Sequence, residues 1–176
     1  MLDHARVAVS DLQDTDLNAL AGEYAKLAHY DLRSRGQTID ILLETRFAPD
    51  LPKVHAAPQE LGRVILNLVH NAAYAVAAKR EKVGPSFTPT VTLTTRALPG
   101  IVELRVRDNG PGIAKDIRDK VFDPFFTTKP AGEGTGLGLS ISHDIVVQRH
   151  GGTIHFDSVE GQYTEFVVSL PAASPI

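Results

Sequence analysis

Two asparagine side chains, Asn67 and Asn71, are the first residues in this sequence that could do chemistry, because they lie four positions apart in a segment with helical periodicity. Residues four apart share one face of a helix, so both amides would face the same way. An asparagine oxygen is a neutral, hard ligand that suits Mg²⁺ when phosphates and waters complete the coordination. The pattern favours Asn71 as that ligand. The alternative is that both amides cap or hydrogen-bond locally.

A second candidate group is the carboxylate of Asp108, which follows an alternating apolar stretch and precedes Gly110 and Gly112. The strand would hold the carboxylate rigidly, and the two glycines would let a flat ligand approach the backbone. A carboxylate is a suitable acceptor for an exocyclic amine such as that of adenine. The alternative is an ordinary turn, since Asp-Asn-Gly sequences commonly form one.

A third segment, from Gly134 to Gly138, is rich in glycine and runs directly into a predicted helix. Its free backbone N–H groups and the positive end of the helix would face the same place, which is favourable for phosphates. The spacing excludes a Walker loop, because no Gly-Lys-Ser/Thr follows, and it differs from the dinucleotide fingerprint. Together the three features indicate a nucleotide site.

The elements that must position these residues mix helices and strands without a repeating βαβ pattern. Periodicity predicts helices at 14–36, 58–82, 115–121 and 139–150, a strand at 38–47, and hairpins at 91–106 and 153–170. Asp14 or Thr15 is the expected cap of the first helix. This order predicts an α+β fold, with helices packed on one face of a mixed, mainly antiparallel sheet.

The composition bounds the class of protein. A chain of 176 residues, 43% of them hydrophobic, is enough for one ordinary domain with a substantial core. The formal net charge of −3 comes from 18 basic and 21 acidic residues spread along the chain, which favours neither nucleic acid nor an anionic membrane as a partner. The sequence has no cysteine, and no apolar run approaches the roughly 20 residues of a membrane span. We therefore expect no thiol chemistry, no membrane contact from this fragment and a cytoplasmic location.

These motifs, in this order, resemble the catalytic and ATP-binding domain of sensor histidine kinases, within the wider family that includes gyrase, Hsp90 and MutL ATPases. The resemblance covers roughly residues 58–170 and includes the stretch Phe122 to Phe126, whose aromatic side chains we expect in the core. It implies a two-layer α/β sandwich of the Bergerat type, which holds ATP–Mg²⁺ between the helix at 58–82 and a lid at about 127–135. The residues that it implies as nucleotide contacts are Asn71, Ala75, Asp108, Gly110, Gly112, Ile113, Lys129, Gly134, Thr135, Gly136, Leu137, Gly138 and Thr164.

One position separates the kinases of this family from the ATPases. The ATPases carry a glutamate one helical turn before the metal asparagine, as the general base for water, and here that position is Asn67, which cannot accept a proton. The resemblance therefore implies Asn67 and Asn71 as the catalytic pair and phosphoryl transfer rather than hydrolysis. Tyr74 stands where many relatives carry a basic residue toward phosphate. Lys129 is expected to reach phosphate, with a solvated lid lysine as the alternative.

The other half of a histidine kinase, a dimerisation hairpin with the phosphoacceptor histidine, is not recognisable in this sequence. Residues 1–13 resemble a remnant of the hairpin's second helix and linker, residues 14–171 the catalytic and ATP-binding domain, and residues 172–176 a tail. The resemblance implies ATP, the acceptor hairpin and the receiver domain of a response regulator as partners, and a homodimeric intact protein. The alternatives are a non-catalytic ATP-binding regulatory module, or an ATPase or serine kinase of the same fold.

Overall fold

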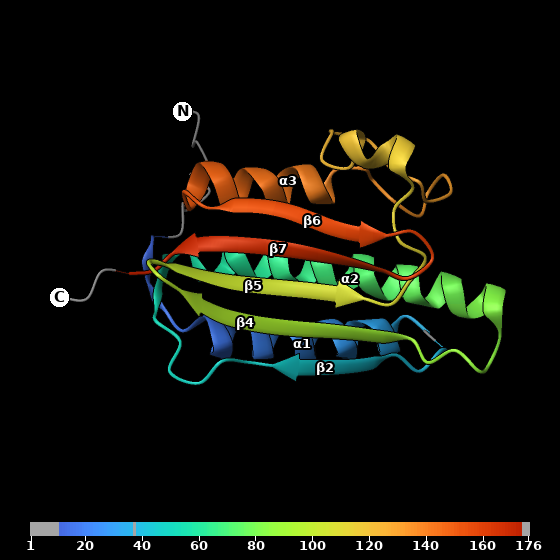
Figure 1. Ribbon diagram of the computed structural model, residues 1–176, viewed down its shortest axis with the longest axis horizontal. Coiled ribbons are helices and arrows are strands. Elements are labelled where there is room, and N and C mark those ends of the chain that lie inside the picture. The colour runs from blue at the N-terminus through green and yellow to red at the C-terminus, as the bar shows by residue number, and fades with distance from the viewer. Residues whose placement is uncertain (1–10, 37, 174–176) are drawn as a thin grey trace, which may run out of the picture.

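The computed structural model describes residues 11–36 and 38–173, and Figure 1 shows how their elements are arranged. A five-stranded sheet lies in front of helices α1 and α2 in this view, and α3 runs along its β6 side. Residues 1–10, where most of the expected hairpin remnant falls, lie outside the described residues, as do the last three residues of the expected tail. In chain order the elements are β1 (Gln13–Thr15), α1 (Leu17–Ser34), β2 (Leu42–Arg46), β3 (Val54–Ala56), α2 (Pro58–Val83), β4 (Thr90–Leu98), β5 (Ile101–Asp108), the 3₁₀ helix η1 (Lys115–Lys120), α3 (Gly138–Asp144), the π-helical turn η2 (Ile145–Arg149), β6 (Thr153–Val159) and β7 (Tyr163–Pro171).

The main sheet has the strand order β2-β4-β5-β7-β6, in which the β2–β4 pair is parallel and the other three pairs are antiparallel. Both predicted hairpins are confirmed, with turns at Pro99-Gly100 between β4 and β5 and at Glu160 to Gln162 between β6 and β7. The predicted fold class, helices on one face of a mixed and mainly antiparallel sheet, is confirmed as well. Hairpins of this kind are local structures, which explains why alternation and turn residues were enough to find them.

A second, two-stranded sheet was not predicted. Strand β1 pairs antiparallel with β3, and Val54 of β3 forms a further bridge with Ala172, beyond the end of β7. The backbone N–H of Ala172 also donates to the carbonyl of Gly100 at 3.0 Å. Strands of three residues are too short to show alternation, so no sequence pattern predicts them. They close the end of the sheet opposite to the end where Asp108 lies.

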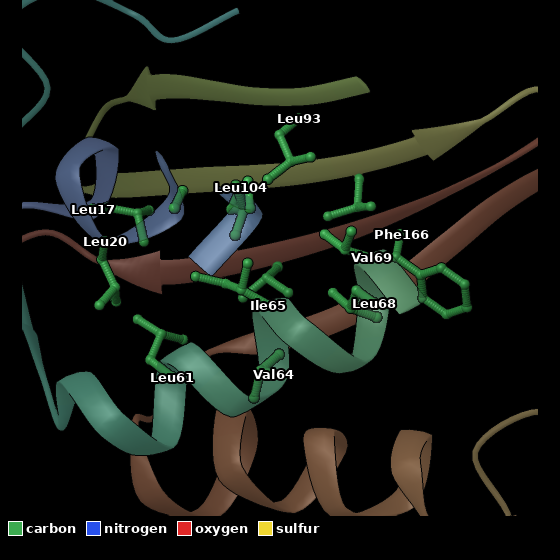
Figure 2. Packing of buried hydrophobic residues seen from close by; sticks show 14 of the residues in the cluster. Leu17, Leu20, Leu61, Val64, Ile65, Leu68, Val69, Leu93, Leu104 and Phe166 are labelled. Atoms are coloured by element: carbon green, nitrogen blue, oxygen red, sulfur yellow. The ribbon is translucent and has the colours of Figure 1, made fainter. Parts of the chain in front are cut away.

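Helix α2 supplies the centre of the core. Figure 2 shows Leu61, Ile65 and Leu68 on the side of this helix that faces Leu93 and Leu104 of the sheet. Burying each such side chain contributes about 1.5–3 kcal/mol, so this stripe holds the helix against the sheet. None of the helices in the described part of the chain has the length and apolarity needed to cross a membrane. The apolar residues on this side of α2 are all buried: Leu61, Val64, Ile65, Leu68, Val69, Ala72 and Val76.

The cap of the first helix was predicted wrongly. Asp16 is the capping residue of α1, and its side-chain oxygen accepts a hydrogen bond from the backbone N–H of Ala19 at 3.1 Å. The two expected candidates, Asp14 and Thr15, belong to strand β1 instead. All three residues have side chains that can cap a helix, so composition alone could not choose between them.

Two other predicted boundaries differ from the structure. Strand β2 covers Leu42–Arg46 rather than 38–47, because it is these five residues that pair with β4. The helix predicted at 139–150 begins at Gly138 and continues from α3 into the π-helical turn of η2. The π-helical stretch is a single turn of five residues, which is too short to show a period of its own in the sequence.

The contact between α1 and α2 requires glycine at position 62 of α2. A Cβ added to Gly62 of α2 would overlap the ring of Tyr24 on α1, whereas a Cβ added to Gly22 of α1 would lie 3.7 Å from Phe47, an ordinary contact distance. We expect Gly62→Ala to lower the free energy of unfolding by about 1–3 kcal/mol through overpacking. The matched change Gly22→Ala should raise it by about 0.5–1 kcal/mol, because alanine is the better helix former. Urea unfolding of both variants tests this contrast, and equal effects would contradict it.

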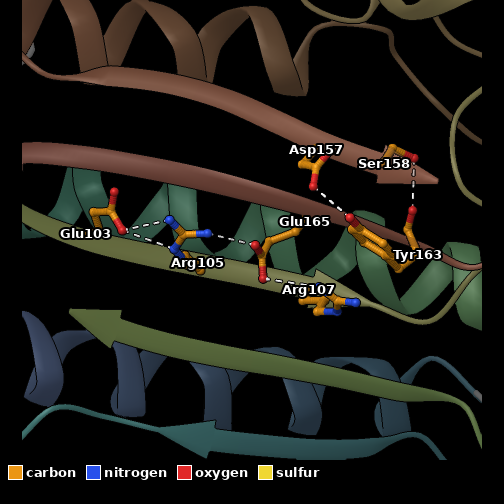
Figure 3. Close-up of polar contacts among 7 residues, drawn as sticks. All are labelled: Glu103, Arg105, Arg107, Asp157, Ser158, Tyr163 and Glu165. Carbon is orange, nitrogen blue, oxygen red and sulfur yellow. Dashed lines mark hydrogen bonds and ion pairs between the residues drawn. The ribbon is translucent and has the colours of Figure 1, made fainter. Parts of the chain in front are cut away.

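The sheet face away from the helices carries a row of alternating charges, which we name the ionic ladder: Glu103, Arg105, Glu165 and Arg107 (Figure 3). The Arg105 guanidinium lies 2.9 Å from Glu103 and 2.9 Å from Glu165, and Arg107 lies 3.9 Å from Glu165. Arg107 also stacks over the ring of Tyr163, 3.7 Å from its centroid. Side chains alternate across a strand, so the neighbouring residues of β5 and β7 face the helices.

Candidate functional site

One end of the candidate site lies where β5 and β7 run side by side. Asp108, the last residue of β5, is opposite Thr164 of β7, and both side chains are on the helix face of the sheet and buried. The Asp108 carboxylate accepts a hydrogen bond from the backbone N–H of Gly110 at 2.8 Å. The Thr164 hydroxyl lies 3.0 Å from the hydroxyl of Ser158, which is also buried. The site therefore combines a carboxylate and two hydroxyls in an enclosed position.

The protonation of Asp108 is finely balanced. Burial raises the pKa of its carboxyl group from 3.8 to about 6, because a charged group loses hydration there. Backbone hydrogen bonds from Gly110 and Thr164 and the positive charges of Lys79 and Arg107 oppose this rise. At neutral pH the carboxylate is mostly ionised and can accept a hydrogen bond from a ligand.

The two glycines after Asp108 are required by close packing. A Cβ on Gly110 would come 2.7 Å from an Asp108 carboxylate oxygen and 3.1 Å from the Cβ of Ala75 on α2. Gly112 has a φ of +72°, and a Cβ there would clash with the carbonyl of Val159. The structure thus brings together three of the residues that the resemblance implies, Ala75, Asp108 and Gly110.

Ser158 is a site residue that the sequence reasoning missed. Its hydroxyl accepts a hydrogen bond from the backbone N–H of Ile113 at 2.8 Å and donates one to the carbonyl of Tyr163 at 2.9 Å. It thereby ties the segment after Gly112 to the β6–β7 hairpin, next to Thr164. Ser158 pairs directly with Thr164 across that hairpin. The register of the predicted hairpin could therefore have identified Ser158 as the residue opposite Thr164.

The other end of the site lies along α2, one turn before Ala75. The side-chain oxygen of Asn71 accepts a hydrogen bond from the Lys129 ammonium at 3.4 Å. Lys129 is half-buried, and burial lowers its pKa. Its ammonium also lies over the ring of Tyr74, 4.5 Å from the centroid, and the Tyr74 hydroxyl donates to Glu133 at 3.0 Å. The predicted lid therefore contacts α2 at Asn71 and Tyr74.

Asn67 is engaged by α3. Its amide nitrogen donates to the buried hydroxyl of Ser142 at 3.2 Å. A Cβ on Gly138 would clash with the Asn67 side-chain oxygen, so the backbone at the start of α3 packs directly on this amide. Asn67 thus joins the helix that carries Asn71 to the end of the glycine-rich segment. A carboxylate for activating water is not present at this position.

The glycine-rich segment folds back on the stretch that precedes it. A Cβ on Gly136, which has a φ of +70°, would clash with the backbone of Phe125. Near the start of the segment, a Cβ on Gly134 would come 2.9 Å from the Thr127 hydroxyl. The Thr135 hydroxyl accepts a hydrogen bond from the backbone N–H of Leu137 at 3.2 Å, directly before α3 begins.

The expectation that the phenylalanines lie in the core is wrong for Phe125. Its side chain is 75% exposed, and its φ of 65° shows a turn conformation that points the side chain outward. Phe122 fits the expectation better, because its ring lies 6.0 Å from that of Phe156 and 6.1 Å from that of Phe166. One aromatic side chain therefore anchors this stretch to the sheet.

His70 turns away from the site. Its Nε2 lies 3.2 Å from a carboxylate oxygen of Asp31 on α1, and burial lowers its pKa although Asp31 opposes that change. Within residues 11–36 and 38–173 no group of three or more histidine, aspartate or glutamate side chains is placed to hold a metal ion. An ion at Asn71 would therefore take most of its ligands from a bound nucleotide and from water.

The two ends of the site form a single line along α2, because Asn71, Ala75 and Lys79 are four residues apart and share a face. One end offers a buried acceptor with close backbone approach at Gly110. The other offers an amide oxygen, the Lys129 ammonium and the glycine-rich segment before α3. An adenine at the first end and phosphates at the second match this distribution of groups.

Comparison with known proteins agrees with this geometry. The family described as histidine kinase-, DNA gyrase B-, and HSP90-like ATPase matches residues 56–174. The chain is 39% identical over 160 residues to the sensor histidine kinase ZraS of Escherichia coli (strain K12), a match that covers 91% of this chain and 31% of ZraS. This chain therefore spans about a third of the length of that relative.

Solved structures show the same fold. The catalytic domain of histidine kinase ThkA superposes with a TM-score of 0.74 at 29% identity, covering 92% of this chain and 96% of that domain. A structure of ThkA in complex with the response regulator protein TrrA matches with a TM-score of 0.69 at 27% identity, covering 92% of this chain and 42% of that chain. The family match spans more than half of the chain and includes Asn67, Asn71, Asp108 and the glycine-rich segment. The chain belongs to the family of histidine kinase-, DNA gyrase B-, and HSP90-like ATPases.

Proposed function

We propose that this chain is the catalytic domain of a sensor histidine kinase, which binds ATP with Mg²⁺ and transfers the γ-phosphoryl group to a histidine on a dimerisation hairpin. The observation that carries the proposal is the line of groups along α2, with the buried Asp108 carboxylate at one end and Asn71 at the other. Family membership supports ATP as the nucleotide. The resemblance to ZraS supports the kinase reaction.

Each group has a role in this proposal. Asp108 accepts a hydrogen bond from the adenine amine, while Thr164 and Ser158 fix the polar surroundings of the base. Asn71 gives Mg²⁺ one oxygen ligand, which suits an ion that keeps phosphates and waters in its shell. Lys129 and the N–H groups of Gly134 to Gly138 bind phosphate oxygens. The metal ion, when bound, neutralises the negative charge that gathers on the phosphates.

Phosphoryl transfer is favoured over hydrolysis by the surroundings of Asn67. Its amide cannot accept a proton, and it is hydrogen-bonded to Ser142 rather than to a group that could activate water. A kinase must avoid hydrolysing ATP before the acceptor histidine arrives, and an amide in this place does not activate water for attack. An ATPase or a serine kinase of the same fold is the second candidate, and a non-catalytic ATP-binding regulatory module is the third.

The partners of this domain follow from the same proposal. The acceptor hairpin and a response regulator receiver domain are expected to dock on it in turn, and the structure of ThkA with TrrA supports the second of these. The intact protein would be a homodimer, since the hairpin of such kinases supplies the dimer contacts. ATP and the response regulator are cytoplasmic molecules, so we place the domain in the cytoplasm. Residues 14–171 would form the domain, after a hairpin remnant and before a short tail.

Transfer to a separately supplied hairpin tests the proposal. We expect this chain, incubated with the acceptor hairpin of the full-length protein and γ-labelled ATP, to place the label on a histidine of the hairpin. Phosphohistidine is recognised because it is labile in acid and stable in base. Labelling absent despite measurable ATP binding would support the non-catalytic module. Steady ATP turnover by the chain alone, abolished by Asn67→Ala, would support an ATPase instead.

A further inference from the structure

The Lys79 ammonium, at the far end of the α2 line, makes three hydrogen bonds to backbone carbonyls. It donates to Asn109 at 3.0 Å, to Gly110 at 3.3 Å and to Gly161 at 3.0 Å. A lysine ammonium has three N–H donors, so its full capacity is used. Its ammonium also lies over the ring of Phe87, 4.8 Å from the centroid. Such a set of contacts fixes a side chain that is otherwise among the most mobile on a surface.

The three carbonyls belong to two different turns that meet beside Asp108. Asn109 and Gly110 form the turn directly after Asp108, while Gly161 lies in the turn between β6 and β7. The two turns also touch each other, since the N–H of Gly161 donates to the carbonyl of Pro111 at 2.6 Å. Lys79 is therefore the point where α2, the turn after Asp108 and the β6–β7 turn are joined.

The charge of Lys79 acts on Asp108 as well. Lys79 from α2 and Arg107 from β5 itself are the two cations that lower the pKa of the Asp108 carboxyl group against the effect of burial. The groups that face Asp108 from β6 and β7 are the neutral hydroxyls of Ser158 and Thr164. Arg107 also stacks on Tyr163 and lies on the opposite face of the sheet. Lys79 is thus a cation on the nucleotide side of the sheet that lowers the pKa of the buried Asp108 carboxyl group, together with the backbone hydrogen bonds from Gly110 and Thr164.

We propose that Lys79 is a positioning residue of the nucleotide site, which joins the two turns so that Asp108 faces the base. The proposal rests on the adenine contact assigned to Asp108 above. It predicts two separable effects of the side chain. The hydrogen bonds set the place of the turns, and the positive charge sets the pH at which Asp108 takes up a proton.

Three substitutions separate these effects. Lys79→Arg keeps the charge and the donors, Lys79→Gln keeps donors without the charge, and Lys79→Met removes both. Lys82→Met serves as the matched control, because Lys82 is an exposed lysine less than one turn further along the same helix. For each protein, ATP affinity is measured by calorimetry between pH 5 and 8, and the titration of the Asp108 carboxyl carbon is followed by NMR without nucleotide.

In the unmodified protein we expect the carboxyl carbon to titrate near pH 6 and ATP affinity to fall as the pH drops through that value. Lys79→Met and Lys79→Gln should both move the midpoint upward by about half a pH unit or more. Lys79→Met should also weaken ATP binding at pH 7 by about tenfold. Lys79→Gln should lose less affinity than Lys79→Met, because it can still bind the turns. Lys79→Arg and Lys82→Met should stay close to the unmodified protein.

Several outcomes would overturn the proposal. An unchanged midpoint and unchanged affinity in Lys79→Met, while Asp108→Asn weakens binding, would show that Lys79 plays no part. Unchanged affinity in Asp108→Asn would instead show that the adenine contact itself is assigned wrongly. Should Lys79→Met fail to fold, Lys79→Gln is compared with Lys79→Arg instead. Only the second keeps the positive charge, so equal midpoints of the Asp108 titration in these two variants would show that the charge of Lys79 has no effect.

Discussion

Asp108→Asn is expected to weaken ATP binding by about 10- to 100-fold, equivalent to about 1–3 kcal/mol, because a neutral amide replaces a charged acceptor. The same substitution should leave the nucleotide-free domain at least as stable as before. Asparagine has nearly the same shape, and its oxygen can still accept the hydrogen bond that Asp108 receives from Gly110. Calorimetry with ATP and thermal unfolding without it measure the two effects separately.

The raised pKa of Asp108 determines how this carboxyl group changes the free energy of unfolding with pH. The folded-state pKa of Asp108 is raised from 3.8 to about 6, so between these values the folded chain binds more protons than the unfolded chain. Linkage then requires that this group makes the domain less stable as the pH rises from about 4 to about 6. At pH 7 the full effect is present and amounts to about 3 kcal/mol at most.

Asp108→Asn should therefore be more stable than the unmodified protein at pH 7, and the difference should shrink as the pH falls toward 4. A variant that loses both stability and ATP binding at pH 7 would contradict the assignment, because it would mean that the carboxylate supports the fold. A variant that keeps full ATP affinity would mean that the base lies elsewhere.

Asn71→Ala is expected to lower the rate of phosphoryl transfer to the acceptor hairpin by about 100-fold or more. Loss of a metal ligand removes several kcal/mol of charge stabilisation, and each 1.4 kcal/mol changes a rate about tenfold. The affinity for ATP should become nearly independent of Mg²⁺ in this variant. Transfer assays with labelled ATP and calorimetry with and without Mg²⁺ test both statements.

The matched control for Asn71→Ala is Gln59→Ala. Gln59 carries an amide on the first turn of the same helix, is exposed, and lies 12 residues before Asn71, about 18 Å along the helix axis. Its substitution removes an amide from α2 without touching the site, so transfer and Mg²⁺ dependence should both be unchanged. Equal losses in the two variants would show that the effect comes from the helix and not from a metal ligand.

The parts of the fold that the sequence predicted are those with strong local periodicity. The apolar stripe of α2 runs through many turns, and the hairpins have clear alternation with Gly100 or Gly161 in their turns. The resemblance also implied Ala75, Asp108 and Gly110 as site residues, and the fold places Ala75 of α2 beside Gly110. Their roles toward ATP and Mg²⁺ stay predictions that the experiments above test.

The parts that the sequence did not predict depend on contacts between distant residues. Lys79 was missed because a lysine on a helix has no pattern that distinguishes it from surface residues, and Ser158 was missed because the register of the predicted hairpin was not followed to the residue opposite Thr164. Only the fold brings Lys79 to the carbonyl of Gly161, 82 residues away. The surroundings of Phe125 have the same origin, because only the fold brings Gly136 so close to its backbone that a Cβ would not fit.

The ionic ladder and the nucleotide site occupy opposite faces of the same two strands, so both depend on the same register between β5 and β7. A slip of one residue between β5 and β7 would turn Thr164 to the face away from the helices, and it would turn Glu165 toward α2 and away from Arg105. A misaligned sheet would thus lose the Arg105–Glu165 ion pair and the polar lining of the site in one step. A ligand stabilises only the state that binds it. ATP would therefore shift the equilibrium toward molecules in which β5 and β7 are correctly aligned.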